Sequence, residues 1–249
     1  MTIGGMTIGG MTEQRHLILA LEGPLAAFGA EIVDAYGRVR DWPGASLLTG
    51  LFANALGWRR GERAAHDRLQ ARLRFAVRLD RPGRRLTDNQ NARLAIGDRG
   101  WTTRGVPEGR DGGAETYNAP HRRFRDYHCD VSVRVAVMLA EPDEAPTLDA
   151  LAAALVEPAR PLFLGRKPCL PARPIFDRWI PAASPLAALA VLPLEFDDDP
   201  VVVLPDGPEV ARLDPIDVAD RRNWLSGLHA GQRRFRRGRL SRLAAGTGP

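Results

Sequence analysis

The chain of 249 residues has only two cysteines and a single lysine, and such shortages exclude several classes of protein. The two cysteines, Cys129 and Cys169, are too few for a disulfide framework or a structural zinc site. No apolar run is long enough to span a membrane, so we expect a cytoplasmic protein without a membrane partner. The sequence also lacks a Walker A motif, a GxSxG motif and any cluster of metal-ligating side chains, so we expect no cofactor and no metal.

Charge is abundant, but its two signs are separated along the chain, whose net charge is +5. Residues 221–249 contain eight arginines and no acid, whereas residues 186–220 contain nine acids and one arginine. The stretch 81–125 contains ten arginines and five acids. Such segregation is typical of a protein with one nucleic-acid-binding face and separate protein-facing surfaces.

Hydrophobic periodicity predicts an α+β fold, because runs of period 2 alternate with apolar runs of helical length. We expect strands at 16–21, 73–79, 130–140, 173–180 and 201–204, and helices at 47–56, 62–70 and 148–156. Residues 28–42 are expected to form an exposed loop, and Arg74, Ala76 and Arg78 to line a solvated face of their strand. The order of elements fits a ferredoxin-like, RRM-like domain with an inserted arm and a smaller C-terminal β-containing region.

Composition and charge divide the chain into four segments. Residues 1–14 repeat the sequence Met-Thr-Ile-Gly-Gly and are expected to be a disordered leader, not a signal peptide. Residues 15–180 are expected to form the ferredoxin-like domain, with the arm at about 81–123. A polar, arginine-rich insertion of this length is usually functional or disordered. An acidic region at 181–220 and an arginine-rich tail at 221–249 complete the expected division.

The first candidate for phosphate binding is a glycine turn that carries two adjacent cations. It consists of Gly165, Arg166 and Lys167. Glycine lets the backbone approach a ligand or adopt a positive φ, arginine binds phosphate through two parallel hydrogen bonds, and lysine is a compact point charge.

The second candidate is the start of the helix that follows Trp42. Unpaired amides at a helix N-terminus attract phosphate, and Arg38 and Arg40 lie just upstream. Ser46 is the expected N-cap. The alternative is an ordinary capped helix beside solvated arginines.

The third candidate is the arm, where arginines and aromatic residues alternate. Arginines supply phosphate contacts and aromatic rings supply stacking platforms, the two requirements of single-stranded RNA binding. The candidate residues in this segment are Arg104, His121, Arg122, Arg123, Arg125 and Tyr127. A solvated charged loop, with its aromatic rings packed at a strand edge, is the alternative.

Two further readings stay open. His121, Tyr127, His128 and Lys167 could supply the base, the acid and the cation of a metal-independent RNA-cleaving site. Nothing in their spacing requires them to meet, and a histidine at the start of a strand is more often structural. The arginine tail could instead make the protein a general basic adaptor with weak, salt-sensitive affinity for any polyanion.

Six motifs occur in an order and with gaps that resemble a known family. They are Leu17-Ile-Leu-Ala-Leu-Glu-Gly-Pro-Leu-Ala-Ala-Phe-Gly29, Trp42-Pro-Gly-Ala-Ser-Leu-Leu-Thr-Gly-Leu51, Thr87-Asp-Asn-Gln-Asn91, Gly100-Trp-Thr-Thr-Arg-Gly105, Phe124-Arg-Asp-Tyr127 and Phe163-Leu-Gly-Arg-Lys-Pro-Cys169. Together they resemble the CasD family of type I-E CRISPR Cascade subunits, which belongs to the RAMP superfamily. The resemblance covers roughly residues 15–180.

The resemblance implies a ferredoxin-like fold whose inserted arm is a thumb, and a non-catalytic subunit that binds the 5′ handle of the CRISPR RNA (crRNA). It implies contacts with the backbone subunit CasC and the large subunit CasA, and only an indirect influence on target DNA, which is read by guide pairing. By position, Arg125 matches an arginine at the handle, Ser46 a helix start near RNA, and Arg166 and Lys167 the basic pair of the glycine turn.

Relatives in type I-C systems cleave RNA with a Tyr/His/Lys-type site. By this resemblance Tyr127, His128 and Lys167 keep an endoribonuclease open as the alternative function.

Overall fold

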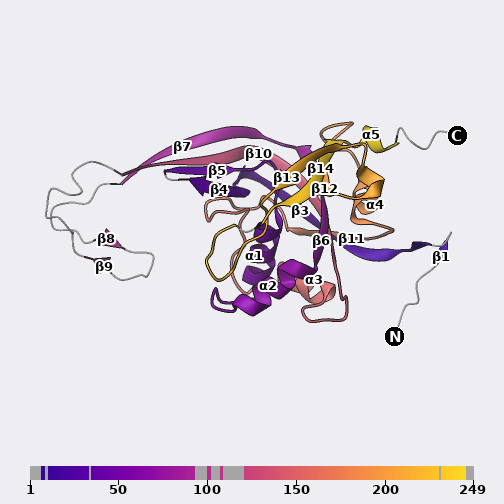
Figure 1. Cartoon of the computed structure of the whole chain (residues 1–249), viewed down its shortest axis with the longest axis horizontal. Helices are drawn as coiled ribbons and strands as arrows, with labels where there is room; N and C mark the ends of the chain where they lie inside the picture. The colour runs from indigo at the N-terminus through magenta and orange to yellow at the C-terminus, as the bar shows by residue number, and fades with distance from the viewer. Residues whose placement is uncertain are drawn as a thin grey trace.

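One curved sheet with helices on both faces organises the protein (Figure 1). The computed structural model describes residues 7–8, 11–33, 35–92, 100–101, 107–108, 121–229 and 231–244. None of the helices in these ranges is long and apolar enough to cross a membrane. Seven strands follow one another across the sheet in the order β11 (Phe176–Ala182), β3 (Gln14–Ala26), β10 (His121–Leu139), β6 (Leu73–Arg81), β12 (Val201–Pro205), β14 (Arg233–Arg239) and β13 (Asp214–Val218).

The first four strands of that order are mutually antiparallel neighbours. Two helices, α1 (Ala45–Ala55) and α2 (Arg63–Arg72), precede β6, and α3 (Leu148–Val156) lies between β10 and β11 in the chain. The α+β class and the three helices are therefore confirmed, with boundaries within about two residues of those expected. Thr147 caps α3, because its hydroxyl accepts a hydrogen bond from the Ala150 amide at 3.3 Å.

The sheet is buried on both faces, because successive strand residues point to opposite sides. On β10, Val133 and Val135 belong to the core that packs against α1, α2 and α3. Ala136, between Val135 and Val137, belongs to a second core on the other side, which includes Leu189 of α4 (Pro185–Ala190). The segment that was expected to be an acidic region thus supplies a helix that covers the second face.

That helix overturns most of the expectation of a solvated face on β6, where only Arg74 is exposed as expected. Ala76 and Arg78 are fully buried, and the Arg78 guanidinium pairs with the Asp80 carboxylate at 2.6 Å. Arg78 also donates hydrogen bonds to the carbonyls of Leu189, Leu192 and Pro193. The expectation was wrong because a charged side chain in an alternating strand can be buried when later segments supply its acceptors.

The expectation of an exposed loop at residues 28–42 was also wrong in part, because two strands run through this segment. Phe28 is fully buried, β4 spans Gly29–Val33 and β5 spans Tyr36–Val39. β5 runs parallel to β10, with Phe124 opposite Tyr36 and Arg125 opposite Gly37. The segment therefore forms a small extension of the sheet at the point where β10 leaves the body of the protein.

β10 is 19 residues long and pairs with two strands in succession, β6 and then β7 (Arg84–Ala92). Between them lie Pro82 and Gly83, and Gly83 has a φ of +74°. A side chain there would place its Cβ 2.4 Å from the Cys129 carbonyl oxygen, so only glycine fits. β7 and the outer half of β10 then project from the body as a hairpin (Figure 1).

The hairpin gives regular structure to both ends of the expected arm. Farther out the structure describes one short pair, β8 (Gly100–Trp101) with β9 (Pro107–Glu108). In the leader, β1 (Thr7–Ile8) pairs with β2 (Met11–Thr12), and residues 1–6 and 9–10 lie outside the described part of the chain.

The C-terminal arginines form a strand of the main sheet, where a tail was expected. β14 pairs with β12 on one side and with β13 on the other, close to the short helices η2 (Pro208–Val210) and α5 (Ser241–Ala244). Five of the eight arginines in residues 221–249 pair with acids of the preceding segment: Arg233 with Asp220, Arg234 with Asp217, Arg236 with Asp206, Arg239 with Asp197 and Arg242 with Asp214. Much of the charge of the two segments is therefore neutralised within the fold.

Burial of one histidine makes the fold sensitive to acid. His16 is fully buried at the start of β3, its Nδ1 lies 2.9 Å from the Gln14 carbonyl oxygen, and burial lowers the imidazole pKa below its ordinary value of 6.5. The folded state therefore disfavours the proton that the unfolded chain binds, so the free energy of unfolding should fall as the pH drops below about 6.5. Urea unfolding of the wild type and of His16→Asn at several pH values measures this dependence, which the variant should lose. Parallel curves for both proteins would contradict it.

Candidate nucleic-acid interface

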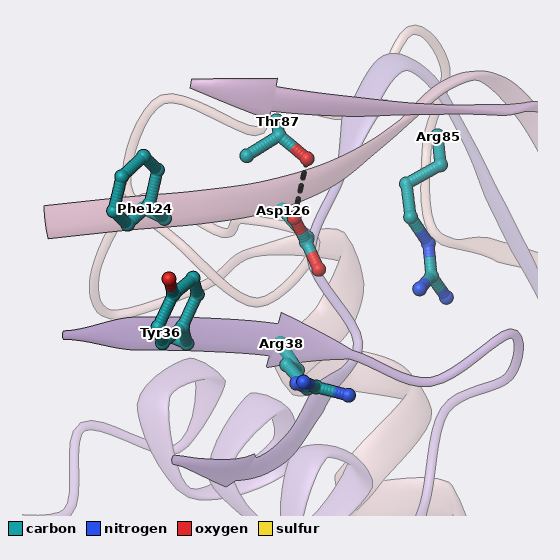
Figure 2. A pocket seen from close by; sticks show the side chains of 7 residues that line it. Tyr36, Arg38, Arg85, Thr87, Phe124 and Asp126 are labelled. Atoms are coloured by element: carbon teal, nitrogen blue, oxygen red, sulfur yellow. Dashed lines mark hydrogen bonds between the residues drawn. The ribbon is translucent and has the colours of Figure 1, made fainter. Parts of the chain in front are cut away.

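An open pocket of ≈ 260 Å³ lies at the base of the projecting hairpin. It is lined by side chains of β5, β7 and β10, which the parallel and antiparallel pairings around β10 bring together. On one side the rings of Tyr36 and Phe124 stack, with centroids 5.0 Å apart and planes inclined by 12° (Figure 2). Tyr36 is 51% exposed, so its ring also presents an open surface to solvent.

The other side of the pocket is polar and positively charged. The Thr87 hydroxyl donates a hydrogen bond to the Asp126 carboxylate at 2.7 Å (Figure 2). Arg38 of β5 is exposed, and no described residue accepts a hydrogen bond from it. Arg85 of β7 reaches the Val39 carbonyl at 3.3 Å and the Asp41 carboxylate at 3.6 Å. A flat stacking surface beside exposed cations is suited to an unpaired base and its phosphate.

Arg125 and Arg166 lie behind the pocket, against Gly37. A Cβ at position 37 would lie 2.6 Å from Arg125 Nη1 and 3.0 Å from Arg166 Nη2, so glycine makes room for both guanidiniums. Arg166 donates hydrogen bonds to the carbonyls of Asp126, at 2.9 Å, and Gly37, at 3.0 Å, and its guanidinium lies over the Tyr127 ring. Arg166 thus joins the glycine turn to β5 and β10, and its role in phosphate binding stays a prediction.

The glycine turn is held against the end of β3. Gly165 has a φ of +100°, and a Cβ there would lie 1.9 Å from the Ala27 carbonyl oxygen. The Ala27 amide donates to the Leu164 carbonyl at 2.8 Å, which fixes the distance between the two segments. Lys167 stands exposed on this turn, and no described residue forms an ion pair with it.

The start of α1, the second expected phosphate site, is occupied by a carboxylate of the protein itself. Asp220 Oδ2 accepts a hydrogen bond from the Ala45 amide at 2.9 Å, and the Asp220 carbonyl accepts one from the Ser46 amide at 2.8 Å. The N-cap residue is Gly44, so the expectation that Ser46 caps the helix was wrong. A Cβ at Gly44 would lie 2.8 Å from the Asp220 Cβ, which explains the glycine.

Arg233 completes this buried site by donating two hydrogen bonds to the Asp220 carboxylate, at 2.9 and 2.6 Å. Arg40, upstream of the helix, donates to the Ala219 carbonyl at 3.1 Å. The cation and the anion that surround the helix start therefore belong to the fold, and the sequence offered no sign that they would meet.

The remaining predicted residues divide between the pocket region and the core. Arg122 and Arg123 are exposed on the outer half of β10, and only the backbone of His121 is described there. Arg104 lies outside the described residues. Tyr127 belongs to the hydrophobic core, and His128 is buried with its Nε2 3.1 Å from the Arg40 carbonyl oxygen. No group of three or more metal-ligating side chains occurs among the described residues.

Sequence reasoning missed several of the residues that line the pocket. Thr87 and Asp126 stand in two separate motifs, and only the antiparallel register of β7 and β10 places them opposite each other. Tyr36 was missed because residues 28–42 were expected to form a loop. Arg85 was missed because it lies in the arm, of which only residues from Arg104 onward were taken as candidates. The alternation of Tyr36, Arg38 and Arg40 with smaller residues was the signal that could have identified β5.

Comparison with known proteins identifies the family of this chain. The family model described as CRISPR-associated protein (Cas_Cas5) matches residues 16–236, a range that begins within β3 and ends within β14. The chain belongs to the Cas5 family of CRISPR-associated proteins. It is also 29% identical, over 181 residues, to the CRISPR system Cascade subunit CasD of Escherichia coli strain K12, across 70% of this chain and 75% of that protein.

Solved structures agree with this assignment. A chain of a CRISPR RNA-guided surveillance complex superposes with a TM-score of 0.67 and 26% identity, covering 90% of this chain and 89% of the other. The crystal structure of a Cas protein superposes with a TM-score of 0.55 and 23% identity, over 91% and 96% of the two chains, and shows the shared fold.

The carboxylate at the start of α1 should be critical for stability. Asp220→Asn should lower the free energy of unfolding by about 2–4 kcal/mol, because it leaves the Arg233 guanidinium partly buried without its anion and weakens the helix cap. Asp217→Asn is the matched control, since Asp217 also accepts two hydrogen bonds from one arginine but in an exposed pair. Its cost should stay within about 1 kcal/mol. Equal urea midpoints for the two variants would contradict the assignment.

The glycine turn offers a second test. Gly165→Ala should destabilise the protein by at least about 1–3 kcal/mol, since it places a Cβ in a left-handed conformation and against the Ala27 carbonyl. Gly61→Ala is the control, because an added Cβ there meets no atom within 4 Å. Thermal unfolding of both variants measures the difference, and a Gly165→Ala protein as stable as the control would disprove the constraint.

Proposed function

We propose that this protein is a non-catalytic subunit of a CRISPR surveillance complex and binds the 5′ handle of the crRNA at the base of its hairpin. The observation that carries this proposal is the pocket, where the stacked pair of Tyr36 and Phe124 stands beside the exposed cation of Arg38. Membership of the Cas5 family and similarity to the Cascade subunit CasD support the same assignment.

In this proposal stacking binds a base of the RNA, and positive charge binds its phosphates. An unstacked base extends the pair formed by Tyr36 and Phe124, a contact worth about 1–3 kcal/mol per base. The phosphates on either side of that base bind Arg38, Arg125 and the exposed Lys167. Thr87 and Asp126 offer hydrogen-bonding groups to the edge of the base, which is how proteins read splayed RNA.

The details of fold and assembly follow from the resemblance. We infer that residues 15–180 form a ferredoxin-like RAMP module, which the strand order β11-β3-β10-β6 supports, and that the hairpin of β7 and β10 is the base of its thumb. The acidic region at 181–220 and the arginine segment at 221–249 act together as a brace for this module. CasC and CasA are the proposed neighbours in the cytoplasm, and target DNA is affected only through the assembled complex.

The alternative function, a metal-independent endoribonuclease, requires Tyr127 and His128 to reach RNA. Both side chains are buried, and the His128 ring stacks on Phe28 with centroids 6.1 Å apart. The general adaptor requires a free basic tail, but the arginines of β14 pair with aspartates. Incubation with repeat RNA in EDTA, beside a Lys167→Ala variant, distinguishes these functions. Intact RNA that is retarded on a native gel supports handle binding, and a single cut lost in the variant establishes the ribonuclease.

Binding of the handle should depend on Arg38, which lines the pocket, and on Arg125, which lies behind it. Arg38→Ala and Arg125→Ala should each weaken the affinity for handle RNA by about 1–3 kcal/mol, and each should reduce the slope of log K against log salt by about 1, since each removes a phosphate contact. Arg234→Ala is the control, because it removes one positive charge from an exposed ion pair with Asp217 of β13, away from the pocket. Fluorescence anisotropy with labelled handle RNA provides the measurement. Affinities equal to that of the control would refute the assignment.

A further inference from the structure

A short loop near the C-terminus, residues Arg222 to His229, is built to hold one shape. Arg222 and His229 face each other in an isolated antiparallel bridge. The Asn223 side-chain oxygen accepts hydrogen bonds from the amides of Leu225, at 2.9 Å, and Ser226, at 3.0 Å. The Asn223 amide donates to the Leu228 carbonyl at 2.8 Å, and Gly227, with a φ of +78°, returns a hydrogen bond to the Asn223 carbonyl. The conformational entropy of this loop is therefore already lost in the folded protein.

The loop is also anchored to α2. The Trp224 ring lies 4.4 Å from the His66 ring of α2. The Gln70 amide group makes two hydrogen bonds with the backbone of Arg222, donating to its carbonyl at 3.0 Å and accepting from its amide at 2.9 Å. Trp224 is half-buried in this contact, whereas Leu225, Ser226 and Leu228 are exposed.

The exposed side chains of the loop include two large apolar ones, Leu225 at 70% exposure and Leu228 at 69%. A single exposed leucine is ordinary, and scattered ones need no explanation. Here one short loop carries two exposed leucines. The hydrogen bonds that fix its conformation involve backbone groups and the Asn223 side chain, so polar residues at positions 225 and 228 would allow the same conformation. Neither leucine contributes to the two hydrophobic cores of the protein.

Two cations converge beside the leucines. A Cβ placed on Gly227 would lie 3.0 Å from Arg222 Nη2 and 3.3 Å from Arg60 Nη2, so both guanidiniums reach the same glycine. Burial, and then the nearby charge of Arg60, lowers the pKa of Arg222. Among the described residues no acid pairs with Arg60 or Arg222, although elsewhere in this region the arginines pair with aspartates.

We propose that the docking loop, residues 222–229 together with Arg60, binds an acidic and apolar segment of a neighbouring protein subunit. The inference rests on the proposed function, since it needs the protein to be part of a complex. Carboxylates of the partner bind Arg60 and Arg222, and its apolar side chains cover Leu225 and Leu228. Arginine beside fully covered apolar anchors is the composition of energetic centres in protein interfaces. An RNA partner is disfavoured, because leucines offer no aromatic surface for stacking and no group that reads a base.

The test assembles the complex from purified partner subunits, crRNA and variants of this protein. Leu225→Ser/Leu228→Ser should reduce incorporation about tenfold or more, since it removes the apolar anchors without altering the loop's backbone hydrogen bonds. Arg60→Glu should weaken incorporation and flatten its dependence on salt, because it reverses one of the two cations. Val191→Ser is the control: Val191 is 69% exposed at the end of α4, on the opposite face of the sheet, and its change should have no effect.

The affinity of each isolated variant for handle RNA is measured as well. This second measurement distinguishes failure of the docking proposal from failure of the proposed RNA-binding function. Incorporation of the double leucine variant equal to that of Val191→Ser would overturn the docking loop. A loss of handle affinity in the leucine variant would also overturn it, since the loop would then contact RNA. If the wild-type protein alone fails to bind the handle while the leucine variant still fails to assemble, the docking loop stands and the RNA assignment falls.

Discussion

The Asp220 carboxylate is the contact on which the arrangement of this protein depends. It lies between the first amides of α1 and the guanidinium of Arg233, so it joins a helix near the N-terminus to a strand near the C-terminus. Each of these groups would be costly to bury alone, and together they satisfy one another. Through this contact β14 is held across the start of α1, where Arg237 also reaches Asp41 at 3.2 Å and the Trp42 ring at 5.5 Å.

The arginines of this chain have two different roles, one in stabilising the fold and one at the exposed hairpin. From β14 to α5 most of the arginines pair with aspartates and serve the fold. Arg38 at the base of the hairpin and Arg122 on the outer half of β10 are both exposed, and no described acid pairs with either. The net charge of the chain therefore says little about where nucleic acid binds, because the densest run of arginine is the one that the fold uses itself.

The sequence predicted the parts of the fold that depend on local pattern. The strand at 73–79 and the helix at 148–156 follow from periods of 2 and 3.6, and both are present. Burial of Arg78, the strand formed by the C-terminal arginines and the occupied start of α1 were not predictable, because each depends on a partner more than a hundred residues away or on an adjacent layer. The alternation of arginines and aromatic residues singled out Arg125, which lies behind the pocket, whereas the pair of Thr87 and Asp126 needed the register of the hairpin.

The contact between Ala45 and Asp220 spans 175 residues, and this separation bears on how the protein is made. A ribosome adding about 5–20 residues per second needs roughly 9–35 seconds to reach Asp220 after it has passed the helix start. During that time the amides of α1 have no carboxylate and the edge of β6 that later receives β12 is open. The nascent chain thus exposes an anion-binding helix end and an unpaired strand edge until its last segment leaves the exit tunnel. A product that terminates early would keep both surfaces open and would be prone to aggregation and to degradation by proteases.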